Sequence, residues 1–418
     1  MNNISRFPYR DMVVPMFDPT DTTFMIFCTV LVMFMTPGLA FFYGGLVGRK
    51  NAVAIMMQSF VAMGLSTIMW VVVGYSLCFS GDVHGVIGNL DNMFLLNMSS
   101  SSESPVNPAL PLYIFLAYQL MVVIITPPLI TGAFTNRVSF KGYLAFLVLW
   151  QLFIYYPLVH MVWGGGAFMS WGVKDFGGGI VVHAIAGMSA LASVLYLGSR
   201  RSPDKPHSIP LIALGMAILW FGWFGFTAGN AFAMNDVAVV AFLNTAIAGG
   251  FASFAWMCMD WGLEGKFKLV GFLTGALAGL VVITPAAGYV TPQAAMVLGI
   301  AAGTVCYLAI MFKNSRKWDD ALDVWGVHGI GGFMGIVLLG IFSSLSVNPD
   351  GADGLLYGGT RFFGMEVAAV AFASFYAFVV TYAIFTVLDR TMTLRVSKKI
   401  EAQGLDEKYH GEQSYDMS

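Results

Sequence analysis

Long apolar runs recur along the whole chain, and they constrain its fold more than any other feature of the sequence. They are separated by polar breaks and lie at residues 24–45, 52–79, 111–133, 142–162, 178–198, 209–230, 237–259, 270–290, 293–312, 323–343 and 362–388. Most have the roughly 20 residues that a helix needs to cross a bilayer. Because a lipid-exposed backbone must satisfy its own polar groups, the pattern predicts an all-α polytopic membrane protein with eleven transmembrane helices.

The composition agrees with this class and excludes a soluble globular enzyme. Of the 418 residues, 57% are hydrophobic and 11% are charged, against about 25% charged in soluble domains. The net charge of -2 includes no basic surplus, so nucleic acid is not an expected partner. The lipid bilayer is the partner that this composition predicts.

The cysteines and the amino-terminal segment suggest no further chemistry. Cys28, Cys78, Cys258 and Cys306 all lie in apolar runs, where we expect buried small hydrophobic side chains rather than disulfides or metal thiolates. We therefore expect no metal and no cofactor. Residues 1–22 lack the apolar core of a cleavable signal peptide, so we expect this segment to be retained.

The basic residues predict the orientation in the membrane. Of the 21 Lys and Arg residues, 17 lie in the first, third, fifth, seventh and ninth loops and in the tail. The other four are Arg6, Arg10, Lys174 and Arg361. Basic loops stay on the cytoplasmic side. With an odd number of spans, the amino terminus is expected outside and the carboxyl terminus in the cytoplasm.

Two similar segments indicate an internal repeat. Asp175 precedes His183 by eight residues in the fifth span, and Asp320 precedes His328 by eight in the tenth. Because five spans separate the histidines, the second copy enters the membrane in the opposite direction, as in an inverted-topology repeat. We expect one repeat at about 24–198 and a second at about 209–343. The eleventh helix, at about 362–388, lies outside both.

Histidines inside a membrane are costly, and such residues usually mark a pathway. At about 1.5 Å per residue, each histidine lies roughly 12 Å from its aspartate, near the middle of the bilayer. Their neutral rings could hold or relay a proton. Two alternatives are histidines bonded only to the backbone and a metal pair, the latter disfavoured because no Cys or carboxylate lies at ligand spacing. An enzyme is disfavoured because no activated nucleophile accompanies them.

Seven motifs in order resemble the ammonium transporter (Amt) family over essentially the whole chain. They are PGLAFFYGGLVGRKN, HMVWGGG, DFGGGIVVH, WFGWFGFTAGN, ITPAAGYV, LDVWGVHGIGG and the tail LRVSKKIEAQGLDEKYHGEQSYDMS. The resemblance implies an ammonium transporter of the cell membrane, built as a homotrimer of eleven-span protomers with one pore in each. It also implies a pseudo-twofold axis relating the first five spans to the next five.

The resemblance also implies an external recruitment site. Trp163 in HMVWGGG matches a tryptophan whose ring face attracts a cation, and which the related Rhesus type typically lacks. Asn230 falls where many members have a serine that binds ammonium, and its amide oxygen can accept the same hydrogen bond. Asp175 matches an aspartate behind the site, where it would cap a helix and favour a nearby cation.

Below this site, the family has two stacked phenyl rings as a gate. Phe226 matches the second ring and also borders the recruitment site, whereas Val122 occupies the position where the first aromatic is usual. This departure puts a two-ring gate in doubt, and Tyr118 or Met121 could fill the space. His183 and His328 match the paired histidines that line an apolar ammonia path, with or without a coupled proton.

The tail completes the expected organisation. Residues 1–390 would form the transport domain, and residues 391–418 a charged cytoplasmic regulatory segment. In the family, this segment contacts neighbouring protomers and accepts a PII-type nitrogen-regulatory protein. An ammonium sensor with little transport is the alternative function, although sensors commonly carry a fused signalling domain that does not follow this tail.

Overall fold

The computed structural model describes residues 17–415, and within this range the chain is helical apart from loops and three isolated β-bridges. Ten helical stretches in it are long and apolar enough to cross a membrane, and one apolar helix is shorter. The predicted all-α polytopic class is therefore confirmed. Arg6, Arg10 and positions 416–418 of the tail lie outside the described residues. The expectation about a signal peptide concerned residues 1–22, most of which also lie outside them.

The helices agree closely with the predicted runs. In chain order they are α1 (Pro19–Leu46), η1 to α3 (Arg49–Phe79), α4 (Leu112–Phe134), α5 to α7 (Phe140–Trp171), η5 with α8 (Gly179–Leu197), α9 (Ile209–Gly229), α10 (Asp236–Glu264), α11 (Leu269–Ile283), α12 (Pro292–Ser315), η6 with α13 (Trp325–Phe342) and α14 (Thr360–Thr391). The short apolar helix is α11.

Two predicted runs differ from the observed helices by more than five residues at one end. The fourth, predicted at 142–162, extends to Trp171 because the chain resumes a helical turn after the glycines of HMVWGGG. The eighth, predicted at 270–290, ends at Ile283, and residues 284–289 form turns. Pro285 accounts for the early end, because a proline has no amide hydrogen with which to continue the helical hydrogen bonds.

Polar side chains fix the start of several helices. Asp18 accepts a hydrogen bond from the Asp21 amide at 2.9 Å and caps α1, and Ser139 caps α5 in the same way. Ser208, Asn235 and Thr291 cap α9, α10 and α12. These side chains satisfy amide groups that would otherwise lack partners at a helix start.

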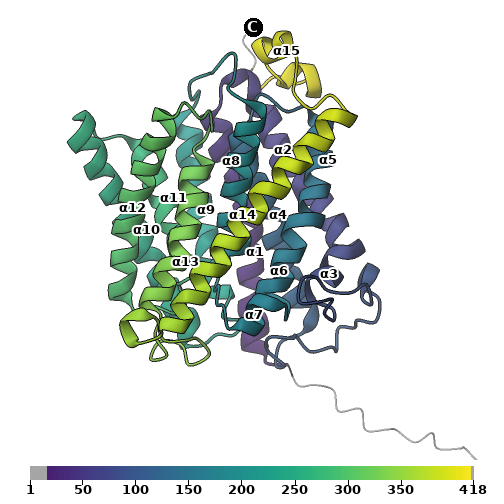
Figure 1. Ribbon diagram of the computed structural model, residues 1–418, viewed down its shortest axis with the longest axis vertical. Coiled ribbons are helices and arrows are strands. Elements are labelled where there is room, and N and C mark those ends of the chain that lie inside the picture. Colours follow the sequence, from purple (N-terminus) through teal and green to yellow (C-terminus); the bar gives the residue numbers. More distant parts are fainter. Residues whose placement is uncertain (1–16, 416–418) are drawn as a thin grey trace, which may run out of the picture.

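Close helix packing holds the bundle together. Helices α1 and α9 pack closely against each other, and a β-carbon on Gly38, Gly45 or Gly215 would collide with the facing helix. Small residues allow this approach in membranes, where packing replaces the hydrophobic effect between helices. In Figure 1, α14 crosses obliquely over the bundle and leads to the tail helix α15 (Lys398–Gln403) at one end.

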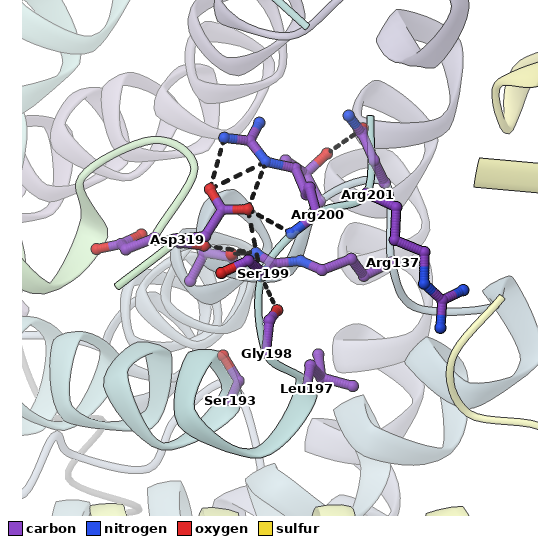
Figure 2. A network of polar contacts seen from close by, with 12 residues as sticks. Arg137, Ser193, Leu197, Gly198, Ser199, Arg200, Arg201 and Asp319 are labelled. Atoms are coloured by element: carbon purple, nitrogen blue, oxygen red, sulfur yellow. Dashed lines mark hydrogen bonds and ion pairs between the residues drawn. The ribbon is translucent and has the colours of Figure 1, made fainter. Parts of the chain in front are cut away.

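A polar network ties the tail to the bundle end where it lies. Arg137 is fully buried, and its guanidinium donates to the carbonyls of Ala133, Gly198 (2.7 Å) and Asp319 (2.9 Å) (Figure 2). The side chain of Asp319 also pairs with Arg200 at 2.7 Å. Since the Val396 amide donates to the Arg137 carbonyl at 2.8 Å, the network connects the tail to loops from both halves of the chain.

The cysteine prediction needs one correction. Cys28, Cys78 and Cys306 are buried as expected, but Cys258 is exposed on α10. The apolar character of a span does not distinguish its lipid-facing side from its core-facing side, and large exposed residues such as Phe254 lie on the same helix. Cys258 is therefore a surface residue of a membrane-spanning helix.

Candidate functional site

The two predicted histidines meet in the interior of the bundle. His183 lies on the π-helical turn η5 (Gly179–Ala184) and His328 on the π-helical turn η6 (Trp325–Gly329). Their Nδ1 atoms are 3.2 Å apart, and their rings are nearly parallel, with centroids 5.3 Å apart. Only 1% and 2% of their surfaces are exposed. Because one Nδ1 must donate and the other accept, the pair shares a single proton along this bond.

Glycines allow the two histidine-bearing segments to approach so closely. A β-carbon on Gly187, four residues after His183, would overlap the backbone of Gly329, one residue after His328. Conversely, a β-carbon on Gly332, four residues after His328, would press on Ala184, one residue after His183. Each segment therefore packs against the other through a glycine four residues after its own histidine.

Asp175 organises the start of η5. Its Oδ1 accepts from the amides of Gly178 (2.8 Å) and Gly179 (2.6 Å), and its Oδ2 from those of Ile180 (2.8 Å) and Val181 (3.4 Å). Burial raises the pKa of Asp175 to about 6, while these four amides act in the opposite direction. The residue is therefore mainly ionised at neutral pH and places a negative charge where the helix dipole favours one.

Asp320 has the corresponding place before η6. Its Oδ2 accepts from the Trp325 amide at 2.7 Å, and burial raises the pKa of Asp320 to about 6. Lys313 donates to its carbonyl at 2.9 Å. Both members of the repeated Asp-and-His pattern thus combine a capping carboxyl with an interior histidine.

A small apolar cavity surrounds the histidine pair. Its volume is about 10 Å³, which is near the minimum for one water molecule. Its lining besides the histidines consists of Met35, Leu39, Ile125, Leu129, Val182, Leu219, Trp223, Phe226 and Leu277. An ion would lose its hydration here without gaining charged partners, so the cavity favours a small neutral molecule.

A larger cavity, which we call the Trp163 vestibule, opens at the bundle end away from the tail. Its volume is about 430 Å³, and Trp163, Asp175 and Asn230 all line it. Trp163 is partly exposed, and its Nε1 donates to the Asp175 carbonyl at 2.7 Å, which fixes the indole ring. Three of the four predicted recruitment residues therefore line one cavity. The fourth, Phe226, does not line it and lines the histidine cavity instead.

The Asn230 amide is oriented by its own helix. Its Nδ2 donates to the Phe226 carbonyl at 2.7 Å, and no described residue donates to its Oδ1. The oxygen can therefore accept a hydrogen bond from a bound cation. This orientation suits the role that the sequence predicted for the residue.

A third cavity, the tail-side vestibule, lies beyond the histidines. It has a volume of about 240 Å³ and is lined by residues that include Arg200, Asp204 and Asp323. His328 and Leu277 line both this vestibule and the histidine cavity. The histidine pair therefore lies between two wider and more polar spaces.

Of the two predicted gate residues, only Phe226 lines one of the three cavities. Phe226 is 1% exposed and lines the histidine cavity, and its carbonyl accepts from the Tyr118 hydroxyl at 2.5 Å. Val122 is fully buried and lines none of the three cavities. Tyr118, one turn before Val122 on α4, is the side chain that contacts the Phe226 segment.

Sequence reasoning missed two residues of this path. Trp223 stacks on His183 with ring centroids 5.5 Å apart and donates to the Thr284 hydroxyl at 2.9 Å. Gln119 lines the Trp163 vestibule and is 4% exposed, and its side-chain amide has no hydrogen-bond partner among the described residues. The motif WFGWFGF contained the signal for Trp223, since Trp223, Phe226 and Asn230 recur at helical spacing. Gln119 had no such signal.

No group of three or more His, Cys, Asp or Glu residues between positions 17 and 415 is arranged to hold a metal ion. The histidine pair has no carboxylate or thiolate beside it among its cavity-lining residues.

The chain resembles known proteins over nearly its whole length. Residues 23–415 match the Ammonium Transporter Family. An ammonium transporter of Bacillus subtilis is 40% identical over 401 residues, which cover 95% of this chain and 99% of that protein. The crystal structure of Candida albicans Mep2 superimposes with a TM-score of 0.86 at 33% identity, covering 92% of this chain and 88% of Mep2. A Sensor Amt Protein gives a TM-score of 0.85 at 26% identity, with coverages of 94% and 98%.

Proposed function

This chain belongs to the ammonium transporter family, and we propose that it recruits ammonium at the Trp163 vestibule, removes a proton and conducts ammonia past the paired histidines into the cytoplasm. The observation that carries this proposal is the histidine pair itself. Its Nδ1 atoms lie 3.2 Å apart in a narrow apolar cavity between two wider vestibules.

Recruitment rests on three groups in the Trp163 vestibule. The indole face of Trp163 attracts a cation, a contact worth about 0.5–2 kcal/mol depending on desolvation. The free Oδ1 of Asn230 accepts an ammonium N–H, and the ionised Asp175 supplies a negative field from behind the ring. These groups compensate for part of the hydration that the ion loses.

Deprotonation follows from the change in surroundings below the vestibule. Phe226, Trp223 and the aliphatic side chains offer no counter-charge, so the charged species is disfavoured there. Ammonium therefore gives its proton to water in the Trp163 vestibule and neutral ammonia enters. The proton either stays outside or travels separately along the histidines and transient water. His183 Nε2 has no protein partner among the described residues. It can therefore exchange hydrogen bonds with a passing ammonia molecule, or accept and return a proton along the pair.

The gate is proposed to depend mainly on Phe226. Hydrogen bonds from Tyr118 and Asn230 to the Phe226 carbonyl hold this turn of α9 in place. Val122 is fully buried, lines none of the three cavities and supplies no second ring. We propose that a single ring, rather than two stacked rings, separates the vestibule from the histidine cavity.

The assembly is proposed as a homotrimer with a pore in each protomer and inverted repeats at about 24–198 and 209–343. The reciprocal glycine contacts and the paired capping aspartates support the repeat. The bias in basic loops supports insertion in the cell membrane with the amino terminus outside. Residues 1–390 would then form the transport domain.

Regulation is proposed to act through the tail, residues 391–418. Its Asp406 accepts from the Val53 and Ala54 amides at the start of α2 (Ala52–Met69), at 3.1 and 2.8 Å. The tail is thus folded on the bundle end that would face the cytoplasm. A PII-type signal protein docking there would reach the tail-side vestibule.

Purified protein in proteoliposomes provides the test. The ammonium concentration outside the proteoliposomes is raised abruptly, and the transient current and the internal pH are recorded together. Current in the inward positive direction means that charge accompanies transport, whereas internal alkalinisation without current means passive ammonia conduction. The absence of both a current and a pH change would contradict transport and favour the sensor function.

A further inference from the structure

His160 is a buried histidine that the proposed transport path does not use. It lies on α6 (Tyr156–Trp163), three residues before Trp163, and its side chain is fully buried. It lines none of the three cavities. Its Nδ1 lies 2.9 Å from the Cys78 carbonyl oxygen, and its Nε2 lies 2.9 Å from Oδ1 of Asp82, in the loop after α3 (Tyr75–Phe79). Both ring nitrogens therefore have partners outside α6.

The chemistry of these two partners decides the protonation of the ring. A carbonyl oxygen only accepts hydrogen bonds, so Nδ1 must carry a proton. Asp82 is ionised at neutral pH, because 49% of its side chain is exposed and hydrogen bonds from the His160 ring and the Gly85 amide lower its pKa against a smaller effect of burial. Since a carboxylate also only accepts, Nε2 must carry a second proton. His160 is therefore a buried imidazolium paired with a carboxylate.

The ion pair holds the outer loop, residues 80–89, against the start of α7 (Ala167–Trp171). Both carboxylate oxygens of Asp82 accept from the Gly85 amide, at 2.9 and 3.1 Å. The Gly85 carbonyl in turn accepts from the Ala167 amide at 2.8 Å. Because His160 precedes the glycines of HMVWGGG and Ala167 follows them, the loop is bonded to both sides of this turn.

The same histidine fixes the glycine turn that follows Trp163. Its carbonyl accepts from the amides of Gly164 and Gly166, both at 3.0 Å. A β-carbon on Gly164 would overlap the Cys78 carbonyl and lie 2.8 Å from the His160 ring, and one on Gly166 would lie 2.9 Å from the same ring. The turn is therefore packed tightly between the ring and the outer loop. Its position determines where Trp163 presents its indole to the vestibule.

We propose that His160 is a positioning residue for ammonium recruitment, whose doubly protonated ring clamps the outer loop onto the turn after Trp163 and so holds the indole in place. This inference rests on the proposed function. Loss of one ring proton would leave Nε2 as an acceptor that faces a carboxylate, and two acceptors repel each other. The clamp is therefore complete while the ring holds both protons, and it opens as the pH rises, which weakens recruitment.

Other titratable side chains lie on the elements around α6, and the test must separate them from His160. Besides Asp82, they are Tyr75 and Cys78 on α3, His84 in the outer loop, Tyr155 on η4 (Gln151–Tyr155), His183 on η5, and Lys174 and Asp175 after α7. His84 is exposed, and its charge acts on Asp82. Within residues 17–415, Asp82 is the charged group that pairs with the His160 ring.

Asp82→Asn separates the clamp from its dependence on protonation. The asparagine NH₂ group can donate to a neutral Nε2, while its oxygen still accepts from the Gly85 amide. The loop then stays clamped when the ring loses a proton. His160→Ala removes the clamp at every pH. His84→Gln is the matched control, because it removes an exposed histidine of the same loop, two residues from Asp82.

Each full-length variant is purified, its thermal unfolding is measured, and its transport is followed by current and internal pH between about pH 6 and pH 9. In the wild type, the half-saturating concentration of ammonium ion should rise about two- to tenfold toward the alkaline end, within the range for a weakened cation–π contact, and the maximal rate should change less. His84→Gln should show the same rise, and Asp82→Asn should show none. His160→Ala should have a raised half-saturation throughout, and it should add little to the effect of Trp163→Leu, because both act on one contact.

An alkaline rise that persists in Asp82→Asn would overturn the proposal, as would a flat profile in the wild type. Full additivity of His160→Ala and Trp163→Leu would also contradict it, because the histidine would then act without the indole. If His160→Ala does not fold, the comparison of Asp82→Asn with the wild type decides the question alone. A wild-type protein with neither current nor internal pH change would instead refute the proposed function.

Discussion

Replacing Asp175 with asparagine tests whether one capping carboxylate supports both the fold and recruitment. Asparagine keeps one acceptor oxygen, which can serve the Gly178 and Gly179 amides at 2.8 and 2.6 Å. Its NH₂ group would then face the Ile180 and Val181 amides, which now donate at 2.8 and 3.4 Å. One good hydrogen bond to a charged group and one weak one are lost.

The expected loss of stability follows from these contacts. A hydrogen bond to a charged group contributes about 1.5–3 kcal/mol, and a buried donor left facing another donor costs a further amount of similar order. Because the 3.4 Å contact contributes little, these two terms together lead us to expect that Asp175→Asn lowers the free energy of unfolding by about 3–6 kcal/mol. Removal of the negative charge should also raise the half-saturating ammonium concentration.

Thermal unfolding of the purified protein in detergent measures the first effect, and proteoliposome currents measure the second. Asp353→Asn is the matched control, because Asp353 caps one amide of an outer loop, that of Leu345 at 2.9 Å, and lines none of the three cavities. Asp175→Asn should unfold at a clearly lower temperature than this control. Identical unfolding temperatures together with an unchanged half-saturation would refute the capping argument.

Four further outcomes are expected. Trp163→Leu should raise half-saturation about two- to thirtyfold, the range for loss of a cation–π contact, and should change maximal current less; equal half-saturation would contradict recruitment at this ring. His183→Ala should abolish transport or remove its charge coupling, and an unchanged rate with unchanged coupling would exclude the proton role. Val122→Phe should lower stability by about 1–3 kcal/mol through overpacking in thermal unfolding, because Val122 is fully buried; wild-type stability would show that room for a ring exists. Since the pKa of Asp175 is about 6, lowering the external pH from 7.5 to 5 should protonate it and raise half-saturation for ammonium ion, whereas Asp175→Asn should lose this pH dependence.

The sequence by itself determined the class of fold and the residue types of the site. Apolar runs of span length leave helices as the only structures that satisfy their backbone in lipid, and the observed helices follow those runs closely. The Asp-and-His spacing and the motif around Trp163 identified residues that do lie together. These signals are local, because helix periodicity and capping depend on neighbours a few residues apart.

Only the tertiary structure decided which side chains meet across the bundle. The 3.2 Å contact between His183 and His328 depends on glycines that let two distant segments cross, and the stacking of Trp223 on His183 depends on the same crossing. The bond from the Lys174 amide to Glu366 joins residues 192 positions apart, and the exposure of Cys258 depends on which face of α10 meets a neighbour. An apolar span looks alike on its buried and lipid-facing sides, because lipid and protein interior are similarly apolar. The packing of helices therefore selects the partners that composition and spacing leave open.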